Sequence, residues 1–582
     1  MESSIIPFPT KGEKIMVPVG SAVVLRDFSP YLPTAPDETR IPWETKAYRL
    51  IDSTPGQMLF VRAPLGLADT APEELDFSTD KMPPVLELRL PFSGTYAVTA
   101  GIPLLSDEVT GVDLALDGET FTAVLPVFGG RRGRLLGERG REYQIFWKNA
   151  VLRDSVLRIR VPYGTFNACD LGYVRAMLSS LSFQRLPDGA PTAPVSGAAD
   201  KDFIIFEDGF SEYALYGIPG ECFDVRLNQA YAGSDVKIFM AQVMGPLLWK
   251  SEVNSYLGEG ATPEQYRGKR TCDVRVIRYV RDSVEKRYEV FRAQTEMCHK
   301  TGAEMHFSIR ANLYWPPKTK YMKGNDYMNG RWWSEHPECR LPGSYQLDYG
   351  RAEVREYYLS VFRDALERFD LDGVNLDLTR WPRCLDARYH SPAVLLGFCR
   401  ELRAVADEFS ARRGKHIKVS LSMVEYYHAG CTLSEQAIDF SALAASGTLD
   451  FICLQAQHPA PYAEIAHKHG MKLYSILEET SPYYDSANKD PLWALPDGTV
   501  QDDPCAGEEY AEHHPVMSYP APFENYRSMD AFYREGADGT AKINGFLGTL
   551  YFRDCGHSDA VRRHAGDDTV FGQCAGEYLF LV

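Results

Sequence analysis

The chain has 582 residues, of which 45% are hydrophobic and 24% are charged, and its formal net charge is −17. A chain of this length exceeds what one hydrophobic core supports, so we expect at least two domains of ordinary globular composition. The negative charge repels a phosphate backbone and no basic stripe offsets it, which argues against nucleic acid as a partner.

The N-terminal stretch MESSIIPFPTKGEKIMVPVG lacks the basic start, the apolar segment and the small-residue cleavage site of a secretory signal. No apolar run reaches the ~18 residues that a membrane-spanning helix needs. The 12 cysteines are scattered singly, without a CxxC pair or a finger-like Cys/His spacing. We therefore expect a cytoplasmic protein with reduced thiols and no membrane segment.

Residues 1–185 contain short runs in which apolar residues alternate with polar ones, separated by Gly, Asp and Pro. The runs are VLELRLPF, TYAVTAGI, GVDLALDG, ETFTAVLPVF, EYQIFW and VLRIRVPY. Their length and period predict an N-terminal antiparallel β-sandwich. We expect it to be a structural support, with carbohydrate binding as the open alternative. The Pro-, Ala- and Gly-rich residues 186–200 predict a linker.

Residues 201–582 show a different sequence pattern, in which apolar runs of five to eight residues alternate with amphipathic stretches. This pattern predicts an α/β domain, and eight alternations favour a (β/α)8 barrel over an open doubly wound sheet. No glycine-rich phosphate loop follows the first run, which removes the main reason to prefer the open sheet. The eight expected strands are 203–208, 236–243, 304–311, 373–378, 417–424, 449–455, 471–477 and 544–551, and the clearest helices are 283–300, 352–369 and 391–412.

The fourth expected strand, in LDGVNLDLTRWP, carries the main catalytic candidate. Alternation places Asn375, Asp377 and Thr379 inside the barrel and the apolar residues between them outside. Reacting groups in such barrels lie at the carboxyl ends of the strands, which makes Asp377 a candidate catalytic carboxylate. The alternative is an internal ion pair of Asp377 with Arg380 or Arg310.

The third expected strand, EMHFSIRA, also turns a polar side inward. Arg310 and Asn312 lie nearest to its carboxyl end and are candidates for orienting a substrate. His306 lies deeper, and we expect it to be a hydrogen-bonded core residue. Buried polar side chains need partners, and the hydroxyl groups of a sugar would supply them.

Hydrolysis of a glycosidic bond uses a second carboxyl group. Glu478, which follows the seventh strand, is the first choice for the acid/base. Glu425 follows the fifth strand and comes next, because its strand parity faces outward. Asp208 ends the first strand and is a candidate for substrate binding, with a turn before Gly209 as the alternative.

Further binding candidates follow other strands of the expected barrel. Gln455 and His458 follow the sixth strand and are candidates for binding sugar hydroxyls, or for satisfying one another. Trp315 and Trp381 offer aromatic faces in loops after strands, with loop packing as the alternative. HExxH is missing and the histidines share no helical spacing, so we expect no metal site and no cofactor.

The segment LDYGRAEVREYYLSVFRDALERFDLDGVNLDLTRWP resembles a bacterial family of glycoside hydrolase-like barrel proteins related to family 10, in which a helix leads into D-G-h-h-h-D-h-h-R-h-P. CHKTGAEMHFSIRANLYWP is similar to the third-strand segment of that family. The resemblance covers most of 201–555 and implies that Asp377 is the catalytic aspartate and Arg380 the motif arginine. The strand also resembles the DGxDxDxE motif of family 18 chitinases, but Asn375 and Thr379 replace two of its acids. That difference counts against a chitinase-like substrate-assisted mechanism.

Together these features predict a glycoside hydrolase acting on a carbohydrate, with Asp377 as nucleophile or base and Glu478 or Glu425 as the acid. Two alternatives stay open. One is a non-catalytic barrel that binds a glycan or a protein, and the other is a carbon–oxygen lyase or isomerase on the same fold.

Overall fold

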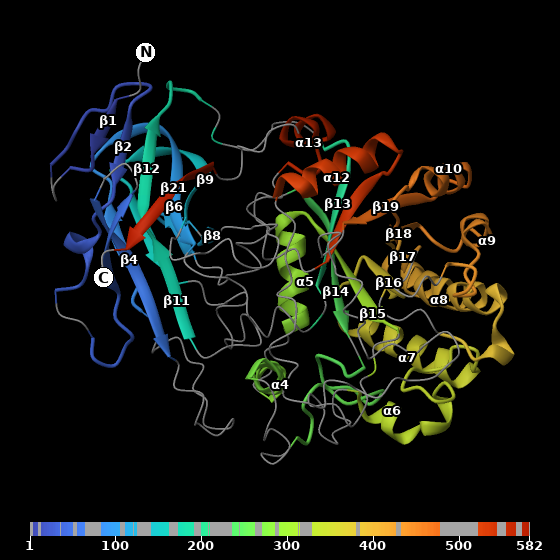
Figure 1. Cartoon of the computed structure of the whole chain (residues 1–582). Helices are drawn as coiled ribbons and strands as arrows, with labels where there is room; N and C mark the ends of the chain where they lie inside the picture. The colour runs from blue at the N-terminus through green and yellow to red at the C-terminus, as the bar shows by residue number, and fades with distance from the viewer. Residues whose placement is uncertain are drawn as a thin grey trace.

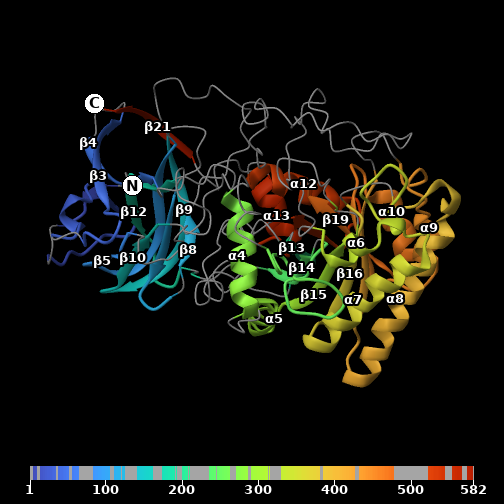
Figure 2. The ribbon, with the colours of Figure 1, turned by 90° about the horizontal axis from the view of Figure 1, so that it is seen from below.

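The computed structural model contains two N-terminal β-sheets that share one core and a closed parallel barrel beside them (Figure 1). The view from below shows the same side-by-side arrangement (Figure 2). The structure describes residues 4–580 apart from 10–12, 35–36, 51–54, 65–82, 105–110, 120, 125–140, 162–172, 191, 193–198, 208, 210–234, 244, 262–270, 286–289, 312–313, 315–328, 380–383, 426–431, 478–521, 544–553 and 566–572.

The strands of the two sheets are β1 (Ile5–Pro7), β2 (Ala22–Leu25), β3 (Glu44–Leu50), β4 (Pro55–Pro64), β5 (Leu86–Arg89), β6 (Ser93–Leu104), β7 (Val112–Leu116), β8 (Thr122–Val124), β9 (Arg141–Arg153), β10 (Val156–Arg160), β11 (Tyr173–Leu178), β12 (Ser180–Arg185) and β21 (Gln573–Phe580). The larger sheet has the order β1-β2-β12-β6-β9-β21-β3-β4-β11, and the smaller one is β5-β10-β7-β8. Val98 and Ile145 of the larger sheet share a buried apolar cluster with Leu88, Leu114 and Leu157 of the smaller. The predicted sandwich, in which two sheets pack their apolar faces together, is therefore confirmed.

Strand β21 joins the sandwich from the far end of the chain. It pairs antiparallel with β9, where Gln573 lies opposite Gln144, and with β3, where Phe580 lies opposite Tyr48. The chain thus returns to the N-terminal sheets after completing the barrel, and local sequence patterns gave no sign of this pairing.

The eight barrel strands are β13 (Asp202–Glu207), β14 (Val236–Val243), β15 (Glu304–Arg310), β16 (Gly373–Asp377), β17 (Lys418–Val424), β18 (Phe451–Gln455), β19 (Lys472–Leu477) and β20 (Gly539–Ile543). All neighbours pair in parallel, and β13 pairs with β20 to close the ring. The predicted (β/α)8 fold is confirmed.

The predicted position of the eighth strand was wrong. The barrel closes with β20 at Gly539–Ile543, whereas the expected run at 544–551 lies outside the described residues. The sequence of β20, GTAKI, begins with glycine and contains Lys542, so it shows a weaker apolar pattern than the run that follows it.

The helices of the barrel half are α4 (Thr271–Glu285), α5 (Val290–Thr301), α6 (Arg331–Glu335), α7 (Ala352–Arg368), α8 (Pro392–Arg413), α9 (Phe440–Ala445), α10 (Ala460–Lys468), α12 (Pro522–Arg534) and α13 (Ser558–Ala565), with 3-10 turns η1 (Ser29–Tyr31) in the sandwich and η5 (Pro337–Cys339) and η6 (Ala387–Tyr389) in the barrel half. Ser391 is the N-cap of helix α8 and Gly414 is its C-cap. The φ of Gly414 is 68°, which suits a residue without a side chain. None of the helices in the described part of the chain combines the length and apolar character that a membrane crossing needs.

The inside of the barrel is divided into two sides. Inward side chains from β13, β18, β19, β20 and the lower part of β14 form a buried apolar cluster: Ile204, Phe206, Ile238, Met240, Phe451, Cys453, Tyr474, Ile476 and Ala541. We call this cluster the apolar side. The inward side chains of β15–β17 are polar and buried: His306, Ser308, Arg310, Asn375, Asp377, Ser420 and Ser422. We call these residues the polar side. The candidate site lies at the carboxyl ends of its strands.

Candidate active site

Asp377 is the last residue of β16 and points into the barrel at the carboxyl end of the strands. It is 1% exposed, whereas Val374 and Leu376 of the same strand pack outward against the helices. The inward orientation predicted from alternation is therefore what the structure shows. The position satisfies the geometric rule that reacting groups of such barrels gather at this end.

Three donors hold the Asp377 carboxylate. Arg310 Nε donates to Oδ2 at 3.0 Å, and Gln242 Nε2 also donates to Oδ2. The Thr379 N–H donates to Oδ1 at 2.8 Å. The Arg310 side chain is itself only 6% exposed, so this is a buried ion pair. The pairing with Arg310 that we considered as an alternative is present, and the carboxylate is fixed in one orientation.

Gln242 is a site residue that the sequence analysis missed. It lies on β14 with the inward parity of Ile238 and Met240, and strand parity alone would have found it. Its Nε2 also lies 3.4 Å from Ser308 Oγ. Its Oε1 is buried and has no hydrogen-bond partner among the described residues. A buried acceptor without a partner is costly, so this oxygen is a natural place for a ligand hydroxyl.

A ladder of hydrogen bonds supports the site from below. Ser308 Oγ donates to Asn375 Oδ1 at 2.8 Å, and Asn375 Nδ2 donates to Ser420 Oγ at 2.9 Å and to Ser422 Oγ at 3.0 Å. Burial raises the pKa of the neighbouring Cys453 thiol well above its usual value, so the thiol is neutral where the ladder meets the apolar side. Gln242 joins this ladder to Asp377, so the polar side apart from His306 is a connected network.

The end of β15 is held by two tyrosines. Tyr349 Oη donates to the Ala311 carbonyl at 2.5 Å, and Tyr358 Oη donates to the same oxygen at 2.9 Å. Tyr314 Oη in turn bonds to Tyr358 Oη. Because Ala311 follows Arg310 directly, these bonds fix the backbone from which the arginine reaches Asp377.

Glu425 lies on the helix side of the strands. It follows β17 with the outward parity that the sequence predicted, and its Oε1 accepts a hydrogen bond from Tyr462 of α10 at 2.8 Å. Gln455, the last residue of β18, has the inward parity of Phe451 and Cys453 and is half-buried. Of these two candidates, Gln455 is the one that shares the inward face with Asp377.

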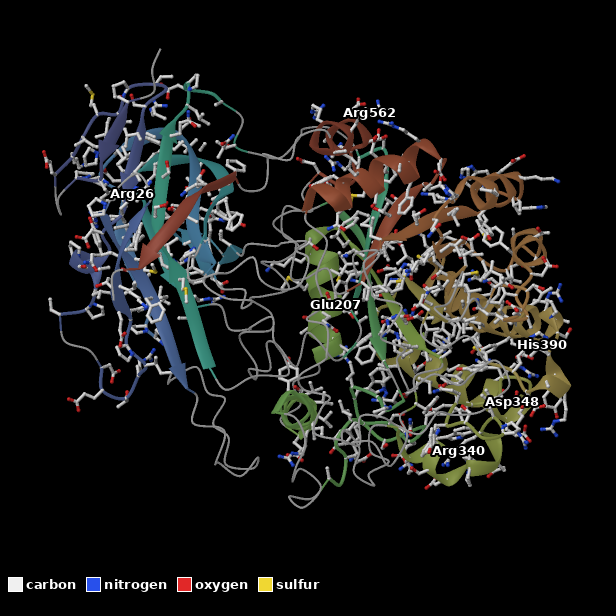
Figure 3. The ribbon with its side chains drawn as sticks, in the orientation of Figure 1. Arg26, Glu207, Arg340, Asp348, His390 and Arg562 are labelled. Carbon is white, nitrogen blue, oxygen red and sulfur yellow. The ribbon has the colours of Figure 1, made fainter. Side chains whose placement is uncertain are left out.

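His458 lies at the surface before α10. Its side chain is 80% exposed and pairs with Glu535, with Nδ1 and Oε1 3.4 Å apart. Glu207, the last residue of β13 and labelled in Figure 3, is buried. It has the outward parity of Phe203 and Ile205. Neither side chain therefore lies on the inward face beside Asp377.

The other site residues predicted from the sequence lie outside the described residues: Asp208, Asn312, Trp315, Arg380, Trp381 and Glu478. Each of them follows the carboxyl end of a barrel strand in the sequence. Their proposed roles stay predictions.

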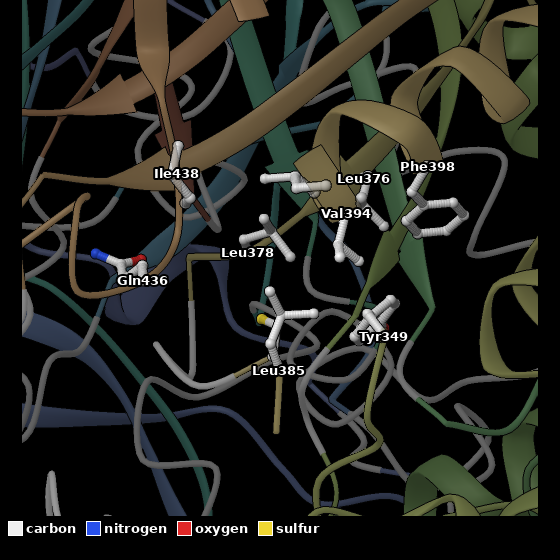
Figure 4. A pocket seen from close by; sticks show the side chains of 10 residues that line it. Tyr349, Leu376, Leu378, Leu385, Val394, Phe398, Gln436 and Ile438 are labelled. Carbon is white, nitrogen blue, oxygen red and sulfur yellow. The ribbon is translucent and has the colours of Figure 1, made fainter. Parts of the chain in front are cut away.

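An apolar pocket lies behind β16, on the opposite side from Asp377. Leu376 of the strand and Leu378 just after it line the pocket together with Phe398 of α8, and Gln436 and Ile438 are among its other lining residues (Figure 4). The pocket therefore belongs to the layer between strands and helices.

Comparison with known proteins gives distant likenesses only. No protein-family model matches the chain, and no curated protein matches it. Among solved structures, the chain is similar to a glycoside hydrolase family 18 N-acetylglucosaminidase from Paenibacillus barengoltzii at 11% identity, over 61% of this chain and 98% of that one, with a TM-score of 0.30.

It is also similar to a GH26-CBM35 β-(1,4)-mannanase from Podospora anserina at 8% identity, over 95% of this chain and 97% of that one, with a TM-score of 0.26. A GH36 α-galactosidase from Geobacillus stearothermophilus is similar at 8% identity, over 83% of this chain and 63% of that one, with a TM-score of 0.30. Likenesses at this level carry no argument, so the functional assignment below depends on the chain's own side chains.

Proposed function

We propose that the chain is a glycoside hydrolase and that Asp377 is its nucleophile or general base. One observation carries the proposal: a buried carboxylate, fixed by Arg310 and Gln242, lies at the carboxyl end of the fourth barrel strand. This is the end of the barrel at which such enzymes hold their reacting groups. The proposed substrate is an oligosaccharide, a polysaccharide or a glycoconjugate.

The hydrogen bonds distinguish the two oxygens of the Asp377 carboxylate. Oδ2 accepts from both Gln242 and Arg310, whereas Oδ1 accepts from the Thr379 N–H alone within the described residues. A carboxylate oxygen has two lone-pair sites, so Oδ1 keeps one for the reaction. We assign Oδ1 as the atom that attacks the anomeric carbon or takes a proton from the attacking water.

Glu478 is our first choice for the acid that protonates the leaving oxygen, because it follows β19 at the same end of the barrel. Glu425 is the second choice. It lies on the helix side of the strands, so it would have to release Tyr462 and turn inward to reach a substrate. A separation of roughly 5–5.5 Å between the two carboxyl groups would give retention, and roughly 6.5–9.5 Å would give inversion.

Substrate hydroxyls would be bound by the polar groups around Asp377. Gln242 Oε1 is a buried acceptor, and Gln455 lies on the inward face of β18, two strands along the ring from Asp377. We further assign substrate binding to Arg310, the last residue of β15, and to residues that follow strand ends: Asp208, Asn312, Trp315, Arg380 and Trp381. His458 is left out because its side chain is exposed and pairs with Glu535. We add Gln242 to this set, because it lies on the inward face of β14 and its Nε2 donates to Asp377 Oδ2.

The division of the chain is also a proposal. We assign 1–185 to a supporting sandwich, 186–200 to a connecting segment and 201–582 to the catalytic barrel, with β21 as the strand that the last part contributes to the larger sheet. The pairing of β21 with β9 and β3 supports a structural role for the sandwich.

The test is a comparison of wild type with Asp377→Asn and Glu478→Gln on a panel of aryl glycosides and oligosaccharides. Loss of an acid/base group lowers the turnover rate by roughly 10²–10⁴-fold, and we expect losses in this range. Asp439→Asn is the matched control, because Asp439 is an exposed helix cap and asparagine caps equally well. Full activity of Asp377→Asn would disprove the assignment.

One observation favours a second function, a non-catalytic barrel that binds a glycan. Among the described residues at the carboxyl end of the barrel, Asp377 is the single inward carboxylate, and Arg310 already balances its charge. The same panel separates the two functions. Binding of an oligosaccharide by calorimetry without turnover of any substrate would establish the binder.

A further inference from the structure

Three side chains that commonly bind metals meet in the turn after α6. His336, Glu338 and Cys339 each offer one ligand atom, and these atoms all lie within 4.8 Å of one another. His336 Nδ1 is 3.0 Å from Glu338 Oε1, and Cys339 Sγ is 3.9 Å from the same oxygen. A tetrahedral zinc ion with bonds of roughly 2.0–2.3 Å has ligand edges of about 3.3–3.6 Å. Shifts of about 1 Å would therefore complete this geometry.

The turn holds the three donors in place before any ion binds. The ring of His336 packs on Trp332 at a centroid distance of 4.4 Å, and Trp332 stacks on Tyr357 of α7 at 4.2 Å. The Cys339 N–H donates to the His336 carbonyl at 3.0 Å, and the Cys339 carbonyl accepts from the Asp348 N–H at 2.9 Å. Preorganisation of this kind lowers the cost of ordering the ligands on binding.

The exposure of the three side chains also bears on ion binding. The side chains of His336 and Glu338 are 40% and 56% exposed, so an ion can reach these two ligands from solvent, and Cys339 is the buried ligand of the set. Burial raises the pKa of the Cys339 thiol, and the Arg351 guanidinium opposes that rise. A bound ion would displace the thiol proton altogether.

We propose that His336, Glu338 and Cys339 bind a zinc ion, with water in the fourth position. A set of one sulfur, one imidazole nitrogen and one carboxylate oxygen matches the ligand preference of Zn²⁺ and not that of Mg²⁺ or Ca²⁺. The site is separate from Asp377 and its function does not depend on the proposed hydrolysis. The ion would fasten η5 to the end of α6, next to Arg340 (Figure 3).

The test uses the full chain, freed of metal with a chelator and titrated with Zn²⁺ or Co²⁺. We expect one equivalent of Zn²⁺ to bind and to raise the melting temperature as its concentration rises. The Co²⁺ form should show a thiolate-to-metal charge-transfer band. Cys339→Ser should abolish that band, and Cys339→Ser and His336→Gln should each weaken Zn²⁺ binding by at least about tenfold.

Two variants control for loss of a cysteine or a histidine elsewhere. Cys384→Ser and His390→Gln replace residues of the same types outside the cluster and should bind Zn²⁺ as wild type does. Far-UV circular dichroism without metal confirms that each variant is folded. Failure of the wild type to bind at micromolar Zn²⁺ would overturn the proposal, and so would unchanged binding by Cys339→Ser.

Discussion

The polar and apolar sides of the barrel interior are buried to the same degree but are held together differently. Ile476 and Phe206 on the apolar side are 1% exposed, and so is Asp377 on the polar side. The apolar side gains stability from burial of hydrocarbon, whereas the polar side must compensate the loss of water through a connected network. Barrel interiors are usually filled by branched aliphatic residues, and the polar side that spans three adjacent strands is where we propose the site.

Hydrogen bonds of the polar side also fix the position of the Asp377 carboxylate. This carboxylate depends on Arg310, which depends on the backbone fixed by Tyr349 and Tyr358. Ser308, Arg310, Asn375 and Asp377 each have a partner on a neighbouring strand. Removal of one member therefore leaves its buried partners without a hydrogen bond. Removal of an apolar group costs only the packing of that group.

The largest expected effect on stability comes from breaking the buried ion pair. Asp377→Ala leaves the Arg310 guanidinium buried without its counter-charge, so we expect the free energy of unfolding to fall by about 3–5 kcal/mol. The double variant Asp377→Leu with Arg310→Met removes both charges and should recover most of that loss. Urea denaturation followed by fluorescence and circular dichroism measures both.

Equal losses in the single and the double variant would contradict this account of the pair. Arg368→Met is a matched control, because Arg368 forms an exposed ion pair with Asp364 one turn away on α7. Such pairs contribute about 0–1 kcal/mol, so this change should have little effect on unfolding.

A smaller effect is expected from the middle of the ladder. Asn375→Ala removes the partner of Ser308, Ser420 and Ser422, and we expect the free energy of unfolding to fall by about 2–3 kcal/mol. Ser420→Ala removes a single hydroxyl and should lower it by about 1 kcal/mol. Similar losses in the two variants would show that these bonds do not act as a network.

The apolar side provides the contrasting measurement. Ile476→Val removes one buried methylene without stranding a polar partner, so we expect a loss of about 0.5–1.5 kcal/mol. The change should leave turnover and sugar binding as in the wild type, because Ile476 contacts the apolar cluster and not Asp377. A loss as large as that of Asn375→Ala would remove the distinction between the two sides.

Most of this architecture was predictable, because strand periodicity is a local property. Alternation alone predicted that Asp377 and Arg310 point inward, and it also predicted that Glu425 points outward. Gln242 obeyed the same rule but was missed, because a glutamine at the end of an apolar run attracts less notice than a carboxylate.

Other features depend on contacts between distant segments. The position of β20 was predicted wrongly because its place in the barrel depends on backbone pairing with β13 and β19, and the strand has no apolar run of its own. The return of β21 to the sandwich depends on its partners β9 and β3 and has no local signal. The His336, Glu338 and Cys339 cluster was missed because its donors meet in a 3-10 turn, where helical spacing does not apply.

A further effect of about 1 kcal/mol, which depends on pH, is expected at the amino end of β15, where Glu304 begins the strand. Its carboxylate accepts from Lys418 Nζ at 2.7 and 2.8 Å and lies 3.2 Å from His306 Nε2. Burial acts to raise the pKa of Glu304, but the hydrogen bonds from His306 and Lys418 outweigh it and lower the pKa to about 2.

Because this pKa is lower in the folded chain than the 4.5 of a free glutamate, the Glu304 contribution is fully present above about pH 4.5 and is lost as the pH falls toward about 2. Lys418 is 34% exposed, so solvent screens the pair and we expect about 1 kcal/mol. Glu304→Gln should lower stability at neutral pH and flatten its fall below about pH 4.5. Glu296→Gln, on the exposed face of α5, should keep the wild-type slope. An unchanged slope in Glu304→Gln would mean that the charges at the lower end contribute nothing, and that the polar side is stabilised by the ladder and the Asp377 pair alone.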